Sequence, residues 1–244
     1  MRDQVYSKAQ SHIVDFAFSE EVAEVFPDMI RRSVPGYETV IPMTGLIAAR
    51  HVKAGDKIID LGCSLGATSQ AIAGQTTKAV SIIGVDNSVP MIEGAIAANT
   101  DPRISFFEAD TLSEHTLELA QGAQVIVMNF VLQFCEPTSR KSLLQALYAA
   151  LAPEGLLILS EKIRDPAESK HSYFDETHLA WKRANGYSDL EVSQKRTSLE
   201  NVMQVDLEQE HLERLTNVGF ASTDQWYKCM NWASYLAWKT SRTP

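Results

Sequence analysis

The sequence contains little cysteine and no side-chain pattern typical of a metal site. Three cysteines occur among its 244 residues, Cys63, Cys135 and Cys229, and no two of them form a Cys-x-x-Cys pair. The six histidines are scattered, without a His-x-x-x-His pair. Sparse, widely spaced cysteines fit a reducing compartment and disfavour a zinc site. We therefore predict that the protein binds no metal.

Long hydrophobic runs are also missing. No apolar stretch approaches the roughly 18 residues that a membrane-spanning helix needs, and residues 1–8 lack the apolar core of a signal peptide. We expect a cytoplasmic protein that does not bind membranes. Because 45% of the 244 residues are hydrophobic, the chain can bury a substantial core. This length predicts one large domain, or one domain with an insertion.

Positive charge is scarce as well. The chain has 22 lysines and arginines against 31 aspartates and glutamates, which gives a net charge of -9. Non-specific affinity for nucleic acids comes largely from cationic side chains that release counterions from the phosphates. Direct binding to nucleic acid is therefore not expected, and a small-molecule substrate is favoured. If that substrate is anionic, individual arginines must bind it against the negative background.

Residues 58–69 form the motif around which the chain is organised. A short apolar run reaches Asp60, turns through Gly62 and Gly66, and continues into a helix-compatible segment. An α/β sheet presents the carboxyl end of a strand to a nucleoside in this way. Ser64 stands where a dinucleotide fingerprint has its central glycine, which disfavours a pyrophosphate. S-adenosylmethionine carries no phosphate and fits better, while an ordinary strand-to-helix turn is the alternative.

Three later strands also end in polar side chains. Asp86 lies 24 positions after Gly62, close to the offset of about 20 residues at which a carboxylate reaches ribose hydroxyls. Asp110 is placed to accept from an adenine amino group, and Asn129 offers a neutral amide beside a sulfonium. The alternatives are capping or loop roles for all three. The strands themselves are expected at 57–61, 80–85, 104–108, 123–128 and 156–160.

The alternation of strands and helices predicts the fold class and the domain organisation. Five strand–helix units imply an α/β protein with a doubly wound, mainly parallel sheet. Residues 223–228 and 232–239 add an edge hairpin, which brings the sheet to seven strands. We predict an N-terminal helical cap at 1–55 and the main domain at 56–244. A charged helical insertion at 163–206 is expected over the carboxyl edge of the sheet, as a lid or a dimer contact.

Some residues have two interpretations. Arg31 and Arg32, followed by Tyr37, either close over a bound anion or form a solvated helix end. Arg196, in the insertion, either binds an anion or is a surface arginine on a solvated helix. Tryptophans in the C-terminal part are better explained by core and edge packing than by base stacking. These are Trp226, Trp232 and Trp238.

Longer segments resemble a known family. Residues 60–67, Asp-Leu-Gly-Cys-Ser-Leu-Gly-Ala, and 86–88, Asp-Asn-Ser, look like a class I S-adenosylmethionine-dependent methyltransferase fold with a Rossmann-like sheet. Residues 25–37, 129–134, 182–188 and 193–203 resemble the carboxy-S-adenosyl-L-methionine synthases of bacterial transfer-RNA wobble-uridine modification. Ordinary methyltransferases lack the last two segments, so the resemblance is specific.

The resemblance implies a reaction and a set of site residues. The enzyme would convert S-adenosylmethionine and prephenate to carboxy-S-adenosylmethionine and phenylpyruvate. It would act as a homodimer and pass its product to a separate transfer-RNA carboxymethyltransferase, giving 5-oxyacetyluridine. Arg196 would bind the added carboxylate. The residues on the family's nucleoside-binding positions are Tyr37, Gly62, Cys63, Ser64, Asp86, Asn87, Asp110, Thr111, Asn129 and Arg196.

The chemistry of such a reaction suggests that the substrate supplies its own base. Deprotonating a sulfonium methyl needs a strong base and the exclusion of water, yet the inferred pocket offers mainly neutral groups. Our hypothesis is that the departing hydroxyl of prephenate takes the methyl proton. Two alternatives remain open. One is a methyltransferase acting on a small acidic molecule, and the other is a non-catalytic module that binds the nucleoside and docks on a modification enzyme.

Overall fold

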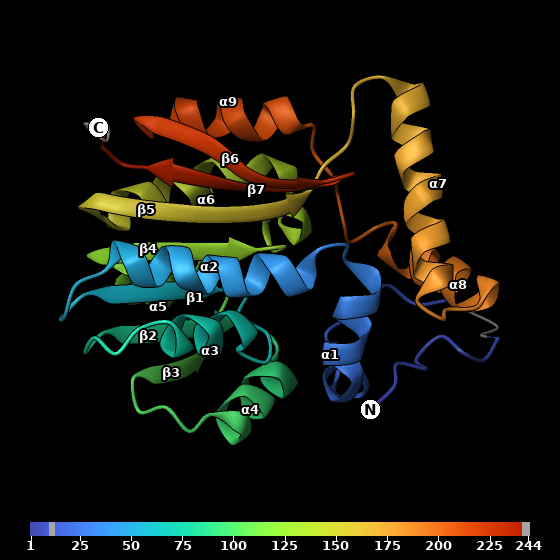
Figure 1. Cartoon of the computed structure of the whole chain (residues 1–244), viewed down its shortest axis with the longest axis horizontal. Helices are drawn as coiled ribbons and strands as arrows, with labels where there is room; N and C mark the ends of the chain where they lie inside the picture. The colour runs from blue at the N-terminus through green and yellow to red at the C-terminus, as the bar shows by residue number, and fades with distance from the viewer. Residues whose placement is uncertain (10–12, 241–244) are drawn as a thin grey trace.

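The computed structural model describes residues 1–9 and 13–240, and its centre is a seven-stranded sheet. The strands are β1 (Lys57–Leu61), β2 (Ser81–Asp86), β3 (Ile104–Glu108), β4 (Ala123–Asn129), β5 (Leu151–Lys162), β6 (Ser222–Cys229) and β7 (Trp232–Trp238). They lie in the order β3-β2-β1-β4-β5-β7-β6 (Figure 1). Neighbours among β1 to β5 are parallel, whereas β7 is antiparallel to both β5 and β6. This confirms the predicted doubly wound, mainly parallel sheet and its edge hairpin.

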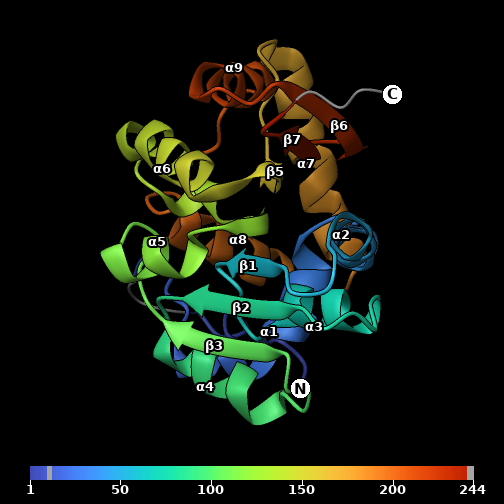
Figure 2. The same ribbon diagram turned by 90° about the vertical axis from the view of Figure 1, so that its left-hand side faces the viewer.

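Helices cover both faces of this sheet and one of its ends. They are α1 (Glu20–Ser33), α2 (Tyr37–His51), α3 (Ala67–Gly74), α4 (Val89–Ala98), α5 (Glu114–Ala120), α6 (Pro137–Ala150), α7 (Glu168–Ala184), α8 (Asp189–Leu199) and α9 (Glu208–Val218). Figure 2 shows α5, α6 and α9 on one face, and α2 and α3 on the other. In Figure 1, α1, α7 and α8 stand beyond one end of the strands. Within residues 1–9 and 13–240, no helix combines the length and apolar character needed to cross a membrane.

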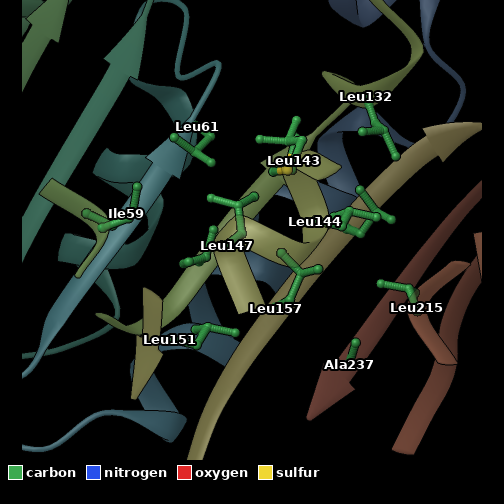
Figure 3. Packing of buried hydrophobic residues seen from close by; sticks show 14 of the residues in the cluster. Ile59, Leu61, Leu132, Leu143, Leu144, Leu147, Leu151, Leu157, Leu215 and Ala237 are labelled. Carbon is green, nitrogen blue, oxygen red and sulfur yellow. The ribbon is translucent and has the colours of Figure 1, made fainter. Parts of the chain in front are cut away.

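The alternation of side chains along β4 divides the core into two layers. Val125 and Val127 pack in the cluster beneath α2 and α3, while Ile126 and Met128 pack in the cluster beneath α5 and α6. All four are fully buried, as expected of a parallel strand covered on both faces. Figure 3 shows the second cluster, where leucines of α6 meet β1 and β5. The parallel strands are thus held rigidly, and their carboxyl ends have fixed positions.

Three local features differ from what the sequence predicts. A proline inside a helix predicts a kink or a new helix start, yet α1 passes through Pro27 without restarting, because Val22 and Met29 on either side of it share one buried face. The pattern of residues 40–50 predicts that Leu46 points inward, but it is 38% exposed; Gly45 lets α2 approach Ala71 of α3 instead. Strand β5 begins at Leu151 rather than 156, after an irregularity in its pairing with β4.

The N-terminal segment is tied to the insertion by buried polar contacts. The Tyr187 hydroxyl donates to the Asp3 carboxylate, and the backbone N–H of Phe16 donates to the carbonyl of Ser198 at 2.8 Å. The Gln194 side chain donates to the carbonyls of residues 6 and 8, both at 2.9 Å. The domain boundary at residue 55 stays a prediction. Helix α2 lies before this boundary, yet it supplies side chains to the core of the sheet.

A buried carboxylate holds the loop after β4. Glu161, at the end of β5, has no exposed surface and accepts backbone N–H groups of Val131, Leu132 and Gln133 at 3.2, 2.7 and 3.1 Å. Burial raises the pKa of this carboxyl to about 8, although the three donors favour its charged form. Glu161 therefore links the end of β5 to the loop that begins at Phe130.

Replacing Glu161 should destabilise the fold. In Glu161→Gln, one acceptor oxygen and an NH₂ donor face three N–H donors, so at least one buried donor loses its partner. We expect the free energy of unfolding to fall by about 1–3 kcal/mol, measured by urea denaturation. The matched control is Glu154→Gln on the same strand, where the side chain is exposed and the change should be near zero. Equal stability of Glu161→Gln and Glu154→Gln would contradict the role of Glu161 in holding the loop.

Candidate functional site

A cavity of about 1140 Å³ lies at the carboxyl ends of the parallel strands. Its walls come from the ends of β2, β4 and β5, the turn after β1, and the helices α1, α7 and α8. The strand order reverses between β1 and β4, which is where doubly wound sheets bind ligands. All ten predicted site residues line this cavity: Tyr37, Gly62, Cys63, Ser64, Asp86, Asn87, Asp110, Thr111, Asn129 and Arg196. Their binding roles remain predictions.

The turn after β1 is positioned by Asp86. One carboxylate oxygen accepts the backbone N–H of Ser64 and the other that of Ser88, both at 2.9 Å. Ser64 has φ of +50°, a conformation that costs energy for a residue with a side chain and often marks functional sites. A Cβ at Gly62 would lie 2.3 Å from a methyl carbon of Val131. The turn therefore requires glycine at 62, and its backbone is open to a ligand.

Burial raises the pKa of both carboxyls behind this turn, but only one of them faces the cavity. Asp86 lines the cavity, and burial raises its pKa against the opposing hydrogen bonds from Ser88 and Ser64. Asp60 lies deeper, accepts a hydrogen bond from the Ser69 hydroxyl at 2.7 Å, and does not line the cavity. Burial raises the pKa of Asp60 to about 7. Asp86 is thus the carboxylate that a ligand can reach, and Asp60 supports the turn from behind.

The loop after β3 forms a more open edge of the cavity. Asp110 is exposed, and its carboxylate accepts the backbone N–H of Leu112 at 2.8 Å. Its carbonyl accepts the hydroxyls of Ser113 and Thr116 at 2.8 and 2.7 Å. These contacts anchor the loop at the start of α5 and leave Thr111 facing the cavity.

Asn129 and Phe130 form the part of the cavity next to β4. The Asn129 amide donates to the Thr68 hydroxyl at 3.3 Å, and its buried Oδ1 has no donor among the residues that the structure describes. Phe130 has φ of +63°, and its ring meets Trp232 edge to face at 5.4 Å between centroids. Trp232 is buried, as its packing role predicted. The position of Tyr37 after a helix end predicts an exposed side chain, but the ring is partly buried beside Phe130.

Cations gather on one wall of the cavity, which α7, α8 and the end of β5 build. Arg196 is exposed to solvent yet lines the cavity. Beside it are three lysines that sequence reasoning missed as site residues: Lys162, Lys182 and Lys195. A signal for two of them was available, because Lys182 and Lys195 lie in segments 182–188 and 193–203, which ordinary methyltransferases lack. We call Lys162, Lys182, Lys195 and Arg196 the cationic wall.

The two arginines near α1 have different surroundings. Arg32 is held by Asp28 at 2.9 Å and by the carbonyl of Asn185 at 2.8 Å, and it stacks on the Tyr187 ring. It does not line the cavity, so its anion-binding interpretation is wrong. Arg31 does line the cavity. No cluster of three or more metal-binding side chains occurs within residues 1–9 and 13–240.

Comparison with known proteins agrees with this geometry. A family model described as a methyltransferase domain matches residues 58–155. An O-methyltransferase family protein from Burkholderia thailandensis shares the fold with a TM-score of 0.67 and 13% identity, covering 91% of this chain and 60% of that one. A likeness at this identity concerns the fold alone.

Two curated relatives match over nearly their whole length. The carboxy-S-adenosyl-L-methionine synthase of Actinobacillus succinogenes is 45% identical over 240 residues, covering 98% of this chain and 99% of that protein. The protein of the same name from Aeromonas salmonicida is 44% identical over 245 residues, covering 98% of both. The chain therefore belongs to the carboxy-S-adenosyl-L-methionine synthase family.

Proposed function

We propose that the protein is a transferase that converts S-adenosylmethionine and prephenate to carboxy-S-adenosylmethionine and phenylpyruvate. The observation that carries this proposal is the single cavity in which the predicted nucleoside residues face Arg196 and the cationic wall. The names of the relatives support it further. A site for the methyl donor alone would not require cations opposite the sulfonium, whereas a site for a carboxylated donor and an anionic second substrate does.

The nucleoside end of the cavity suits S-adenosylmethionine. Asp86 is already oriented by two backbone donors and has remaining lone pairs for the two ribose hydroxyls. Asp110 and Thr111 would meet the adenine at the open edge. The buried Oδ1 of Asn129 is free to accept from the amino group of the ligand, and Tyr37 and Phe130 supply apolar surface. The backbone of residues 62–64 and the side chain of Asn87 would complete the binding site.

Two side chains of the cavity are poorly suited to act as the base, which supports a base supplied by the substrate. Burial lowers the pKa of His178 to about 3, so it is a weak proton acceptor, and Asp86 is committed to two backbone donors. Prephenate would lose carbon dioxide and become aromatic as its hydroxyl departs. That hydroxide would take a proton from the sulfonium methyl, forming water and an ylide. The ylide carbon would then attack the carbon dioxide, and Arg196 would bind the new carboxylate.

The wider role follows from the family resemblance. We propose that the enzyme works as a cytoplasmic homodimer and supplies its product to a separate transfer-RNA carboxymethyltransferase for wobble-uridine modification. The net charge of -9 supports a division of labour in which this chain does not itself bind transfer RNA.

The reaction itself is tested by incubating the protein with S-adenosylmethionine and prephenate and analysing the products by mass spectrometry. We expect carboxy-S-adenosylmethionine and phenylpyruvate in equal amounts. S-adenosylhomocysteine and a methylated acid would instead identify a methyltransferase acting on a small acidic molecule. An absence of turnover, together with a stable complex with a modification enzyme, would favour a binding module.

Arg196→Lys should weaken retention of the carboxylated nucleoside but not of S-adenosylmethionine. Arginine binds a carboxylate through two parallel hydrogen bonds, and lysine keeps the charge but not this geometry. We expect roughly tenfold weaker binding of carboxy-S-adenosylmethionine, measured by isothermal titration calorimetry. S-adenosylmethionine, which lacks the carboxylate, is the internal control, and Arg183→Lys outside the cavity is the matched variant. Equal retention by both variants would refute the assignment of Arg196.

Asp86→Asn should weaken binding of both nucleosides equally. The amide offers one acceptor oxygen where the carboxylate offers two, so the ribose and the backbone donors compete for it. We expect affinity to fall by roughly tenfold to a hundredfold, again by calorimetry. Asp224→Asn, at an exposed position of β6, should leave the affinity unchanged. The ribose role fails if Asp86→Asn binds S-adenosylmethionine as tightly as the unaltered protein.

A further inference from the structure

Charged side chains of both signs line the cavity, and cations predominate on the side of the insertion. The acids Asp86 and Asp110 follow β2 and β3, whereas the cationic wall is built by β5, α7 and α8, where the acids Asp175 and Glu200 line the cavity in smaller number. Since the protein as a whole carries a net charge of -9, this gathering of cations is local. Such a wall predicts a ligand with more negative charge than one new carboxylate on the nucleoside.

Lys182 is the least compensated member of the cationic wall. Its side chain is only 7% exposed and lines the cavity. Within the described part of the chain, its ammonium forms no ion pair or hydrogen bond. Asp175 is the acid whose charge acts on Lys182, but its carboxylate is already paired with Lys162 at 3.3 Å and accepts a hydrogen bond from Asn231 at 3.1 Å. Burial, reinforced by the charge of Lys162, lowers the pKa of Lys182 to about 8.

Lys195 lies beside it with partial compensation. It is 5% exposed and lines the same cavity. Its ammonium donates to the Ser33 hydroxyl at 3.1 Å and lies 3.9 Å from the Asp3 carboxylate. Burial and then the charge of Lys182 lower the pKa of Lys195 to about 7, so the two ammonium groups interact. Two buried cations side by side cost free energy that an anion between them would recover.

We propose that Lys182, with Lys195 beside it, binds the carboxylate that the second substrate keeps through the reaction, the one on its 2-oxo acid side chain. This inference rests on the proposed function and adds the position of the second substrate. It replaces Arg32, which is held elsewhere, as a candidate for that anion.

The chemistry distinguishes the retained carboxylate from the departing one. An ammonium clamped on the departing carboxylate would stabilise the charge that decarboxylation must remove, and so would raise the barrier. A fixed cation is useful only on the carboxylate that remains charged in substrate and product. Held there, the substrate would place its departing carboxylate near the sulfonium methyl, so that carbon dioxide is released where the ylide forms, and Arg196 would meet the carboxylate only after it has been transferred.

A purely structural role for Lys182 and the proposed anion-binding role predict opposite changes in stability when the lysine is replaced. If the lysine stabilised the fold, replacing it would lower the melting temperature. A buried ammonium without an acid partner destabilises instead, so Lys182→Met should melt at the same temperature or higher. Lys182→Gln is a second variant, which keeps a polar group should methionine pack badly.

The kinetic test is the steady-state rate as a function of each substrate. For Lys182→Met, we expect KM for prephenate to rise about tenfold to a hundredfold, with kcat and KM for S-adenosylmethionine nearly unchanged, because the contact is the same in substrate and transition state. Phenylpyruvate should become a weaker product inhibitor by a similar factor, since it keeps that carboxylate. Lys170→Met, an exposed lysine on the same helix outside the cavity, is the matched control.

The outcomes separate this inference from the proposed function. If the unaltered protein turns over prephenate but Lys182→Met and Lys182→Gln keep its KM and its inhibition by phenylpyruvate, the lysine assignment is overturned and the function stands. If no turnover occurs, calorimetry with phenylpyruvate on protein saturated with S-adenosylmethionine still decides. Weaker binding of phenylpyruvate to Lys182→Met than to the unaltered protein supports the anion site, and equal binding to these two proteins overturns it.

Discussion

The buried carboxylate of Asp3 is the contact on which the arrangement of the cavity depends. It accepts the Tyr187 hydroxyl and the backbone N–H of Val5, and it lies 3.9 Å from the Lys195 ammonium. One acid near the N-terminus thereby fixes the segment that joins α7 to α8 and a lysine of α8 itself. Together with the contacts of Gln194 and Phe16, it ties the insertion to the N-terminal segment and so holds the helices of the cationic wall at the carboxyl ends of the strands.

This constraint explains how an acidic protein presents a cationic surface to a small anion. The strand ends carry the carboxylates and the amide that are proposed to bind a nucleoside, and β5 adds Lys162. The insertion supplies Lys182, Lys195 and Arg196, which line the same cavity although they follow β5 in the sequence. Helices α1, α7 and α8 cover the carboxyl ends of the strands (Figure 1), so the reacting groups would meet away from bulk water, which an ylide requires.

Sequence reasoning predicted the sheet, and the residues it picked at the strand ends line one cavity, because both depend on local patterns. Asp86 and Asn129 follow apolar strands, and the carboxyl ends of parallel strands converge. The cationic wall was largely missed, because the inward direction of Lys182 depends on how α7 docks against a segment more than a hundred residues away. The structural role of Glu161 was not predicted, because it depends on three N–H groups of a loop that is distant in the sequence.

The central claim is that one cavity holds the sulfonium and the anion together, so that carbon dioxide released from one is captured by the other. The most direct measurement uses prephenate labelled in its departing carboxyl group, in buffer containing excess unlabelled bicarbonate, followed by mass spectrometry of the nucleoside. The account predicts that the label appears in carboxy-S-adenosylmethionine without dilution. Dilution to the level of the dissolved pool, or a nucleoside that gains no carboxyl group, would contradict it.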